Sequence, residues 1–148
     1  MDNWISGTTK HSLCGVWWTC SKGLWREREL NDIDIYVPDV NFQSVVDFGS
    51  AFIAYGPTHH LGAQWDLTYV KFNYQSQDIE VGSDKACKIF NHHQSKWITP
   101  VIDFQNYQRH NIFGVELRVM AKNDLLTYKK LLNRTIDIEA ILAIEANP

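Results

Sequence analysis

Two aspartates, Asp32 and Asp34, are the residues of this sequence whose types and spacing most directly suggest chemistry. They stand in Asn31-Asp32-Ile33-Asp34-Ile35, an alternation of polar and apolar residues that predicts a β-strand. Side chains two residues apart on a strand point to the same face, so the two carboxylates should project together while the isoleucines enter a core. Neighbouring carboxylates stay ionised only beside a cation or strong donors. Their oxygens suit Mg²⁺ or Mn²⁺ shared with substrate phosphates.

A purely structural explanation of the pair is also open. Acidic residues are common on the solvated face of a strand. A chain with this many aspartates contains roughly one Asp-x-Asp by chance, so the bare pattern is a weak motif. The surrounding sequence has to decide between a metal site and a solvated surface.

Glycine and arginine residues upstream of the strand fit a phosphate site. Gly15 lies in Leu13-Cys14-Gly15-Val16-Trp17, near the expected start of a helix, and Arg28 lies just before the strand. A glycine lets the backbone approach a triphosphate, and a helix N-terminus offers free N–H groups to phosphates. The arrangement resembles the nucleotidyltransferases of the DNA polymerase β-like superfamily. It is most similar to the small antibiotic-modifying and uncharacterised members, in which a glycine pair opens a helix, an arginine follows and a strand carries Asp-x-Asp.

The resemblance assigns roles by position. Gly15 matches the first glycine of the family's pair, and Val16 stands at the second, where its side chain would lie in the usual path of the phosphates. Arg28 matches the arginine, and Asp32 and Asp34 match the metal motif. The resemblance therefore implies a triphosphate site at Gly15, Val16 and Arg28 beside a metal site at the two aspartates.

Family catalysis also uses a third carboxylate on a neighbouring strand, which completes the metal site and can act as the base toward a hydroxyl acceptor. The segment Gln77-Asp78-Ile79-Glu80-Val81 offers two acids on one face. Glu80, between apolar neighbours, is the preferred match, as a metal ligand and a catalytic residue with Asp32 and Asp34. Asp78 is the alternative, and a solvent-facing acidic pair is the structural explanation.

The C-terminal part is similar to the family's closing pattern, in which a strand leads to a helix with lysine and an Arg-x-x-Asp step before a final helix. Lys129 and Lys130 stand on the expected helix, and Arg134 and Asp137 form the step. The three basic residues are candidates for triphosphate contacts. A solvated helix face, with a weak ion pair between Arg134 and Asp137, is the alternative.

The elements that would position these residues are predicted from periodicity. Apolar spacing predicts helices over 12–25, 39–48, 125–132 and from 135 or 137 to 144, with Asp39 and Asn123 as N-caps. Strand patterns cover 31–37, 65–81, 87–90, 101–107 and 115–119, with a loop from 56 to 64 and a turn at 82–84. We therefore expect an α/β or α+β fold, a short mixed sheet flanked by helices.

Composition limits the class of protein. The 148 residues fit one domain over 1–148, and 45% apolar content is enough to bury a core. A net charge of −3 with scattered basic residues gives no strong nucleic-acid signal. The three cysteines lack C-x-x-C spacing, which supports neither disulfides nor structural zinc. Without a signal peptide or a long apolar run, we expect a soluble cytoplasmic protein with no membrane partner.

The resemblance implies transfer of a nucleotidyl group from a nucleoside triphosphate, ATP among them, with Mg²⁺ or Mn²⁺ as cofactor and pyrophosphate as leaving group. The acceptor is unknown; a small hydroxylated compound is one possibility, and a protein or the end of a tRNA is another. A homodimer could supply the acceptor wall that larger members take from a helical domain. Val16 supports a different hypothesis, a catalytically inactive, antitoxin-like module that binds a nucleotide or a protein partner. An α+β binding protein with a chance Asp-x-Asp is the third.

Overall fold

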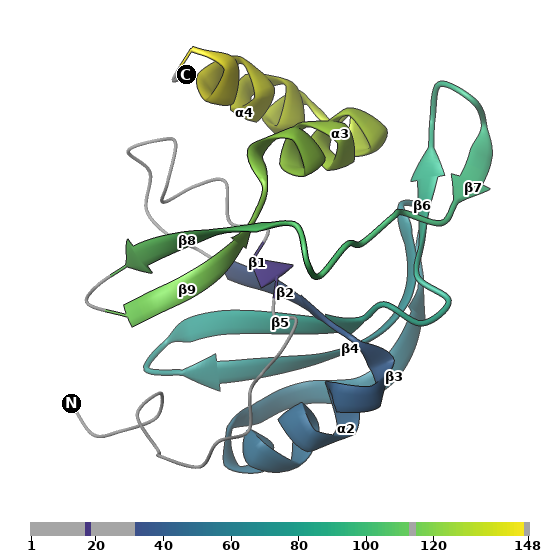
Figure 1. Cartoon of the computed structure of the whole chain (residues 1–148). Helices are drawn as coiled ribbons and strands as arrows, with labels where there is room; N and C mark the ends of the chain where they lie inside the picture. The colour runs from purple at the N-terminus through teal and green to yellow at the C-terminus, as the bar shows by residue number, and fades with distance from the viewer. Residues whose placement is uncertain (1–16, 19–31, 113–114, 147–148) are drawn as a thin grey trace.

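One mixed sheet organises the chain (Figure 1). The structure is a computed structural model that describes residues 17–18, 32–112 and 115–146. The strands are β1 (Trp17–Trp18), β2 (Asp32–Val37), β3 (Ile53–Leu61), β4 (Trp65–Tyr74), β5 (Gln77–Ser83), β6 (Lys88–Asn91), β7 (Lys96–Ile98), β8 (Tyr107–Ile112) and β9 (Val115–Met120). Their order is β7-β6-β4-β5-β2-β1-β9-β8, with β3 paired to β4. The helices are α2 (Asp39–Phe48), η1 (Ser50–Phe52, a 3₁₀ turn), α3 (Lys122–Leu132) and α4 (Thr135–Glu145).

The sheet has helices on opposite faces, α2 on one and α3 with α4 on the other (Figure 1). The face toward α2 carries the apolar residues of β2, β4 and β5, which pack on two residues of the helix. This first cluster is Val37, Val70, Phe72 and Val81 with Phe42 and Val46. Burying a side chain of this size stabilises a fold by about 1.5–3 kcal/mol, so this layer fixes which face of each strand turns inward.

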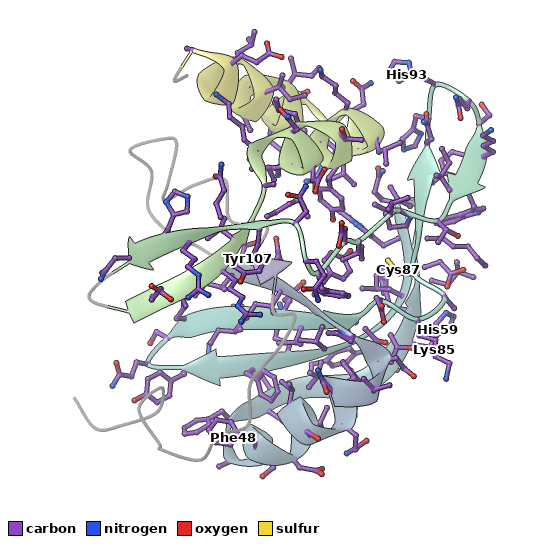
Figure 2. The ribbon with its side chains drawn as sticks, viewed as in Figure 1. Phe48, His59, Lys85, Cys87, His93 and Tyr107 are labelled. Carbon is purple, nitrogen blue, oxygen red and sulfur yellow. The ribbon has the colours of Figure 1, made fainter. Side chains whose placement is uncertain are left out.

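Helix α3 packs on the opposite face of the sheet. Tyr36, Cys87, Met120 and Leu125 form the buried cluster there, and Figure 2 shows the Cys87 sulfur between α3 and the sheet. A Cβ on Gly82 would lie 2.9 Å from Leu67 and 3.2 Å from Tyr36, so a larger residue there would require these side chains to shift.

The two C-terminal helices are joined by a buried ion network. Asp137 of α4 is fully buried and accepts hydrogen bonds from Lys129 of α3 at 3.1 Å and from the Arg134 guanidinium at 2.6 and 3.0 Å. The i,i+3 pair expected between Arg134 and Asp137 is confirmed, but its carboxylate is in the core rather than on a solvated face. Charges buried in this way hold α4 on α3 as long as all of them are paired.

The expected mixed α+β class is confirmed, and β2, β6, β9, α2, α3 and α4 lie where the sequence predicts them apart from small differences at their ends. The single strand pattern predicted over 65–81 is two strands, β4 and β5, joined by a turn at 75–76. Among the described residues, no helix is both long and apolar enough to cross a membrane. The turn predicted at Gly82 begins later, at Asp84, because Ser83 still pairs with Val37 in the sheet.

Both N-cap predictions are wrong. Asp39 is the first residue of α2, and its own N–H donates to the carboxylate of Asp84 at 2.8 Å. The Asp39 carboxylate instead accepts a hydrogen bond from Ser83 at 3.0 Å. Asn123 lies inside α3, which begins at Lys122. Tertiary contacts have therefore replaced the local capping that the sequence suggests.

The helix predicted over 12–25 is wrong at Trp17–Trp18, which form β1; the rest of that range lies outside the described residues. Trp17 pairs with Tyr36 of β2, and Trp18 pairs with both Ile35 and Val119 of β9. Apolar spacing in a segment rich in apolar residues does not separate a helix from a buried strand, and pairing on two sides decides for the strand.

Two other segments differ from prediction. The loop expected from 56 to 64 is mostly β3, an edge strand whose register shifts around Gly56-Pro57 allow a proline within it. The strand expected over 101–107 is irregular until Tyr107, because Asp103 accepts the N–H of Gln105 at 2.9 Å and closes a local turn.

The buried network predicts a loss of stability when its carboxylate is removed. Asp137→Ala should lower the free energy of unfolding by about 3–5 kcal/mol, because the buried charge of Lys129 and the half-buried charge of Arg134 would lose their acceptor. Urea unfolding of both proteins at neutral pH measures the change, with Asp47→Ala on the exposed side of α2 as the control.

The loss should depend on pH. Burial alone raises the pKa of Asp137, but the hydrogen bonds from Arg134 and the charge of Lys129 outweigh it and hold this pKa below its ordinary value. The carboxylate therefore contributes stability above the pKa of an unfolded aspartate, about 3.9, and loses it as the pH falls through the lower folded pKa. The gap between wild type and Asp137→Asn should narrow below pH 4; a constant gap down to pH 2 would contradict this.

Candidate functional site

The parallel pairing of β2 with β5 brings the predicted acids together. Asp34 is the register partner of Glu80, and Asp32 is the register partner of Asp78. Register partners share a face of the sheet on strands about 4.8 Å apart, so all four side chains start from one small area. Ile33 of β2 and Ile79 of β5 turn to the other face. The strand register therefore places Asp32, Asp34 and the two acids of β5 on one face, as expected.

Strand β4 adds a cation and an amide to this area. Lys71 is the register partner of Glu80, and Asn73 is the partner of Asp78. The Lys71 ammonium lies 2.8 Å from Glu80 and 3.6 Å from Asp78. The Asn73 amide donates to Asp78 at 2.7 Å. Both acids of β5 thus have partners on the β4 side, away from β2.

The row Asp34–Glu80–Lys71 therefore runs across three strands and has its positive charge at one end. The hydrogen bond to Glu80 is the main factor that raises the pKa of Lys71; partial burial opposes it, and the charges of Glu80 and Asp78 add to it. Lys71 is accordingly charged at neutral pH. On these three strands the four acids of β2 and β5 face one cation, Lys71. This area holds a locally concentrated negative charge.

The chemistry of the donors fits a hard divalent cation at Asp32 and Asp34, since Mg²⁺ commonly takes one or two carboxylates and completes its shell with phosphate and water. In the described part of the chain, however, no group of three or more His, Cys, Asp or Glu side chains converges closely enough to hold a metal ion. Glu80 is engaged by Lys71. Asp32 and Asp34 fit a divalent cation. Glu80 would bind the same cation only after its ion pair with Lys71 breaks.

Arg134 provides positive charge near Asp34. Its hydrogen bonds to Asp137 are the main factor that raises its pKa, burial opposes this, and the negative charge of Asp34 is among the smaller factors that add to it. The guanidinium also stacks over the ring of Trp65, 4.9 Å from its centroid. Because it is held from two sides, Arg134 keeps its charge in a fixed place beside the acidic area.

The two lysines proposed with Arg134 have other partners. Lys129 is buried against Asp137, so it stabilises the helix pair rather than reaching toward solvent. Lys130 is exposed and lies 3.8 Å from Glu145 of α4. Of the three basic residues, Arg134 is the one whose charge acts on Asp34.

A buried group of hydroxyls and a thiol lies beneath α3, next to Asp34 along β2. The Tyr36 hydroxyl is 3.5 Å from that of Tyr128 and 3.7 Å from the Cys87 sulfur. Burial raises the pKa of Tyr128 to about 12, hydrogen bonds with Tyr36 and Trp65 oppose this, and the charge of Asp34 adds to it. The pKa values of Tyr36 and Cys87 are raised in the same way, chiefly by burial. These groups stay protonated at neutral pH.

The loop predicted from 56 to 64 includes His59 and His60, but both lie in strand β3. His59 instead bonds Asp66 of β4 at 2.6 Å, a contact that lowers the pKa of this acid. His92 and His93 lie in the turn between β6 and β7. Adjacent positions on a strand point to opposite faces, so His59 and His60 cannot chelate one ion together.

Gly15, Val16 and Arg28, the residues assigned to the triphosphate, lie outside the described residues. The structure adds residues that the sequence did not single out. Lys71 is the nearest to the acids, and its only sequence signal is its place in the alternation of β4.

A second missed group lies on the β8–β9 hairpin, where Arg109 and Arg118 are direct cross-strand partners. They stack on the ring of Tyr107, with distances of 5.7 and 4.7 Å to its centroid, and Figure 2 labels Tyr107 on this part of the sheet. Tyr107 pairs with Met120 of the cluster under α3, so the group shares a sheet face with the acids.

Comparison with known proteins identifies the fold. No protein-family model matches the chain, and no curated protein does. The structure is similar to the crystal structure of a putative nucleotidyltransferase from Thermotoga maritima, with a TM-score of 0.60 and 16% sequence identity. The match covers 90% of this chain and 84% of that one. The expected nucleotidyltransferase-like fold is therefore confirmed.

The buried tyrosines predict an alkaline weakening of the fold. A pKa raised from about 10 in the unfolded chain to about 12 means that Tyr128 contributes stability below pH 10 and loses it as the pH rises through 12. Urea unfolding between pH 9 and 12 should show a steeper loss for wild type than for Tyr128→Phe. Equal losses in the two proteins would contradict the burial argument.

Proposed function

We propose that this protein transfers a nucleotidyl group from a nucleoside triphosphate to an acceptor hydroxyl, with a divalent cation as cofactor. The observation that carries the proposal is the in-register pairing of β2 and β5, which sets Asp34 beside Glu80 on one face of the sheet. The nucleotidyltransferase-like fold supports it, because this is the chemistry that the name of the Thermotoga maritima protein suggests.

Asp32 and Asp34 would hold the Mg²⁺ or Mn²⁺ ion, and Glu80 would complete the set, with Asp78 as the alternative. When bound, the cation neutralises charge on the phosphates and orients them for displacement of pyrophosphate. The chain's own contribution is to place charges. The three carboxylates confine the cation to one face, and either acid of β5 could accept the proton of the attacking hydroxyl.

Positive groups beside the carboxylates would hold the triphosphate. Arg134, fixed by Asp137 and stacked on Trp65, lies near Asp34 and suits phosphate oxygens. Gly15, Val16 and Arg28 are proposed for the same ligand from the family resemblance. A guanidinium that is already held in place loses little freedom on binding, which favours affinity.

The acceptor stays open in this proposal. A small hydroxylated compound is the first class to test, and ATP is the first nucleotide. The stacked arginines of the β8–β9 hairpin share the face of the acids and could line the acceptor's side. A homodimer could supply a further wall.

A second candidate function is a catalytically inactive module that binds a nucleotide or a protein partner. Two observations favour it. Glu80 is bound by Lys71 rather than turned toward Asp34, and Val16 replaces a glycine of the family's motif. This candidate predicts nucleotide binding without turnover, or no nucleotide binding at all.

Nucleotide binding tests the proposal first. With saturating ATP and Mg²⁺, wild type should gain about 2–4 kcal/mol of stability, because the ligand binds the folded state alone. Asp34→Asn should lose this gain, since it removes a charge from the cation site while keeping its size. Thermal unfolding with and without Mg²⁺ measures it, and Asp47→Asn on α2 is the matched control. A gain that survives in Asp34→Asn would contradict the site.

Turnover separates the two candidate functions. Pyrophosphate release in the presence of a panel of hydroxylated acceptors should depend on Mg²⁺ and fall about 100-fold or more in Asp34→Asn. The Asp47→Asn control should keep the wild-type rate. Stabilisation by ATP without pyrophosphate release from any acceptor would favour the inactive module.

A further inference from the structure

We infer that Lys71 is an exchangeable counter-ion of the site. Without nucleotide it holds Glu80 and Asp78, and on binding it passes to the phosphates and frees Glu80 for the cation. The inference rests on the proposed function and adds a residue that neither the sequence motifs nor the fold match assigns. It makes assembly of the third carboxylate dependent on the nucleotide.

The position of Lys71 supports this role. It lies in the row Asp34–Glu80–Lys71, directly across β5 from the proposed cation site. Its ammonium contacts Glu80 at 2.8 Å and Asp78 at 3.6 Å, so one group engages both candidates for the third carboxylate. A cation at Asp34 would draw phosphates to the same face, within reach of this flexible side chain.

The energetics allow the exchange. The side chains of Lys71 and Glu80 are 31% and 38% exposed. Contact with water at this level screens the attraction between the two charges and weakens the ion pair. A triphosphate offers lysine several anionic oxygens at once, and phosphates are common ligands for its compact charge. The nucleotide can therefore displace the carboxylate at little cost.

A fixed structural ion pair would be arranged differently. Lys129 and Asp137 are such a pair, since Asp137 is fully buried and also accepts two hydrogen bonds from Arg134. Lys71 instead divides its contact between two acids at unequal distances, at the edge of an area with an excess of negative charge. The negative charge of the whole area attracts the Lys71 ammonium, and no single hydrogen-bond geometry fixes its position.

The experiment compares wild type, Lys71→Met and Lys71→Arg for two ligands, Mn²⁺ alone and ATP with saturating Mg²⁺, by isothermal titration calorimetry. In Lys71→Met, Mn²⁺ alone should bind several-fold more tightly, because Glu80 is released and a competing positive charge is gone. ATP with Mg²⁺ should bind about ten-fold more weakly, the effect expected for one lost charged contact. Lys71→Arg keeps the charge and should stay close to wild type.

Lys88→Met is the matched control, since Lys88 is also a partly exposed lysine that pairs with an acid, Asp66, on another part of the sheet; it should change neither affinity. If wild type binds ATP and both affinities are unchanged in Lys71→Met, the inference is wrong while the proposed function stands. If both affinities fall together, Lys71 has only a structural role and the inference is again wrong. If wild type itself binds no nucleotide with Mg²⁺, the proposed function fails first.

Discussion

The structure depends on one constraint above all, the in-register parallel pairing of β2 with β5. Ile33 and Val81 are buried toward α2, and a slip of one residue would turn them to the opposite face and force acids into the core. Core packing on one face thus fixes the position of the acids on the other. No contact among the carboxylates is needed to hold Asp34 beside Glu80, which is why an arrangement with so much like charge can persist.

The second support of the site is the attachment of α4 to α3. Asp137 satisfies Lys129 on one helix and Arg134 at the start of the other. The same carboxylate therefore joins the two helices and fixes the Arg134 guanidinium, which lies near Asp34. The helix pair covers only part of its sheet face, where Tyr36 and Leu125 are buried. The acidic part of that face, at Asp32 and Asp34, stays exposed to solvent and ligands.

Local sequence patterns predicted the elements around the acids and the fold class, because the alternation in β2 and the helical spacing of α3 are both strong. These patterns gave wrong predictions where contacts with residues far away in the sequence determine the local structure. Trp17–Trp18 is a strand because β2 and β9 lie on either side of it, and Asp39 is not a cap because Asp84 takes that role from another loop. The contact of Lys71 with Glu80 could not be predicted either. It follows from the antiparallel register of β4 and β5, to which a lone lysine in a strand gives no clue.

The acidic face brings carboxylates of two neighbouring strands close together, where they repel each other. Like charges on neighbouring strands destabilise a sheet. Lys71 and Asn73 offset this repulsion for the acids of β5, and Arg134 places positive charge near Asp34. A cation and a polyanion bound together would neutralise both the acids and the lysine in one step. The arrangement of charges across β2, β5 and β4, acid–acid–base, has the same order as the cation and phosphates it would receive. Under the proposed function, a metal–nucleotide complex would match this order of charges better than either partner alone.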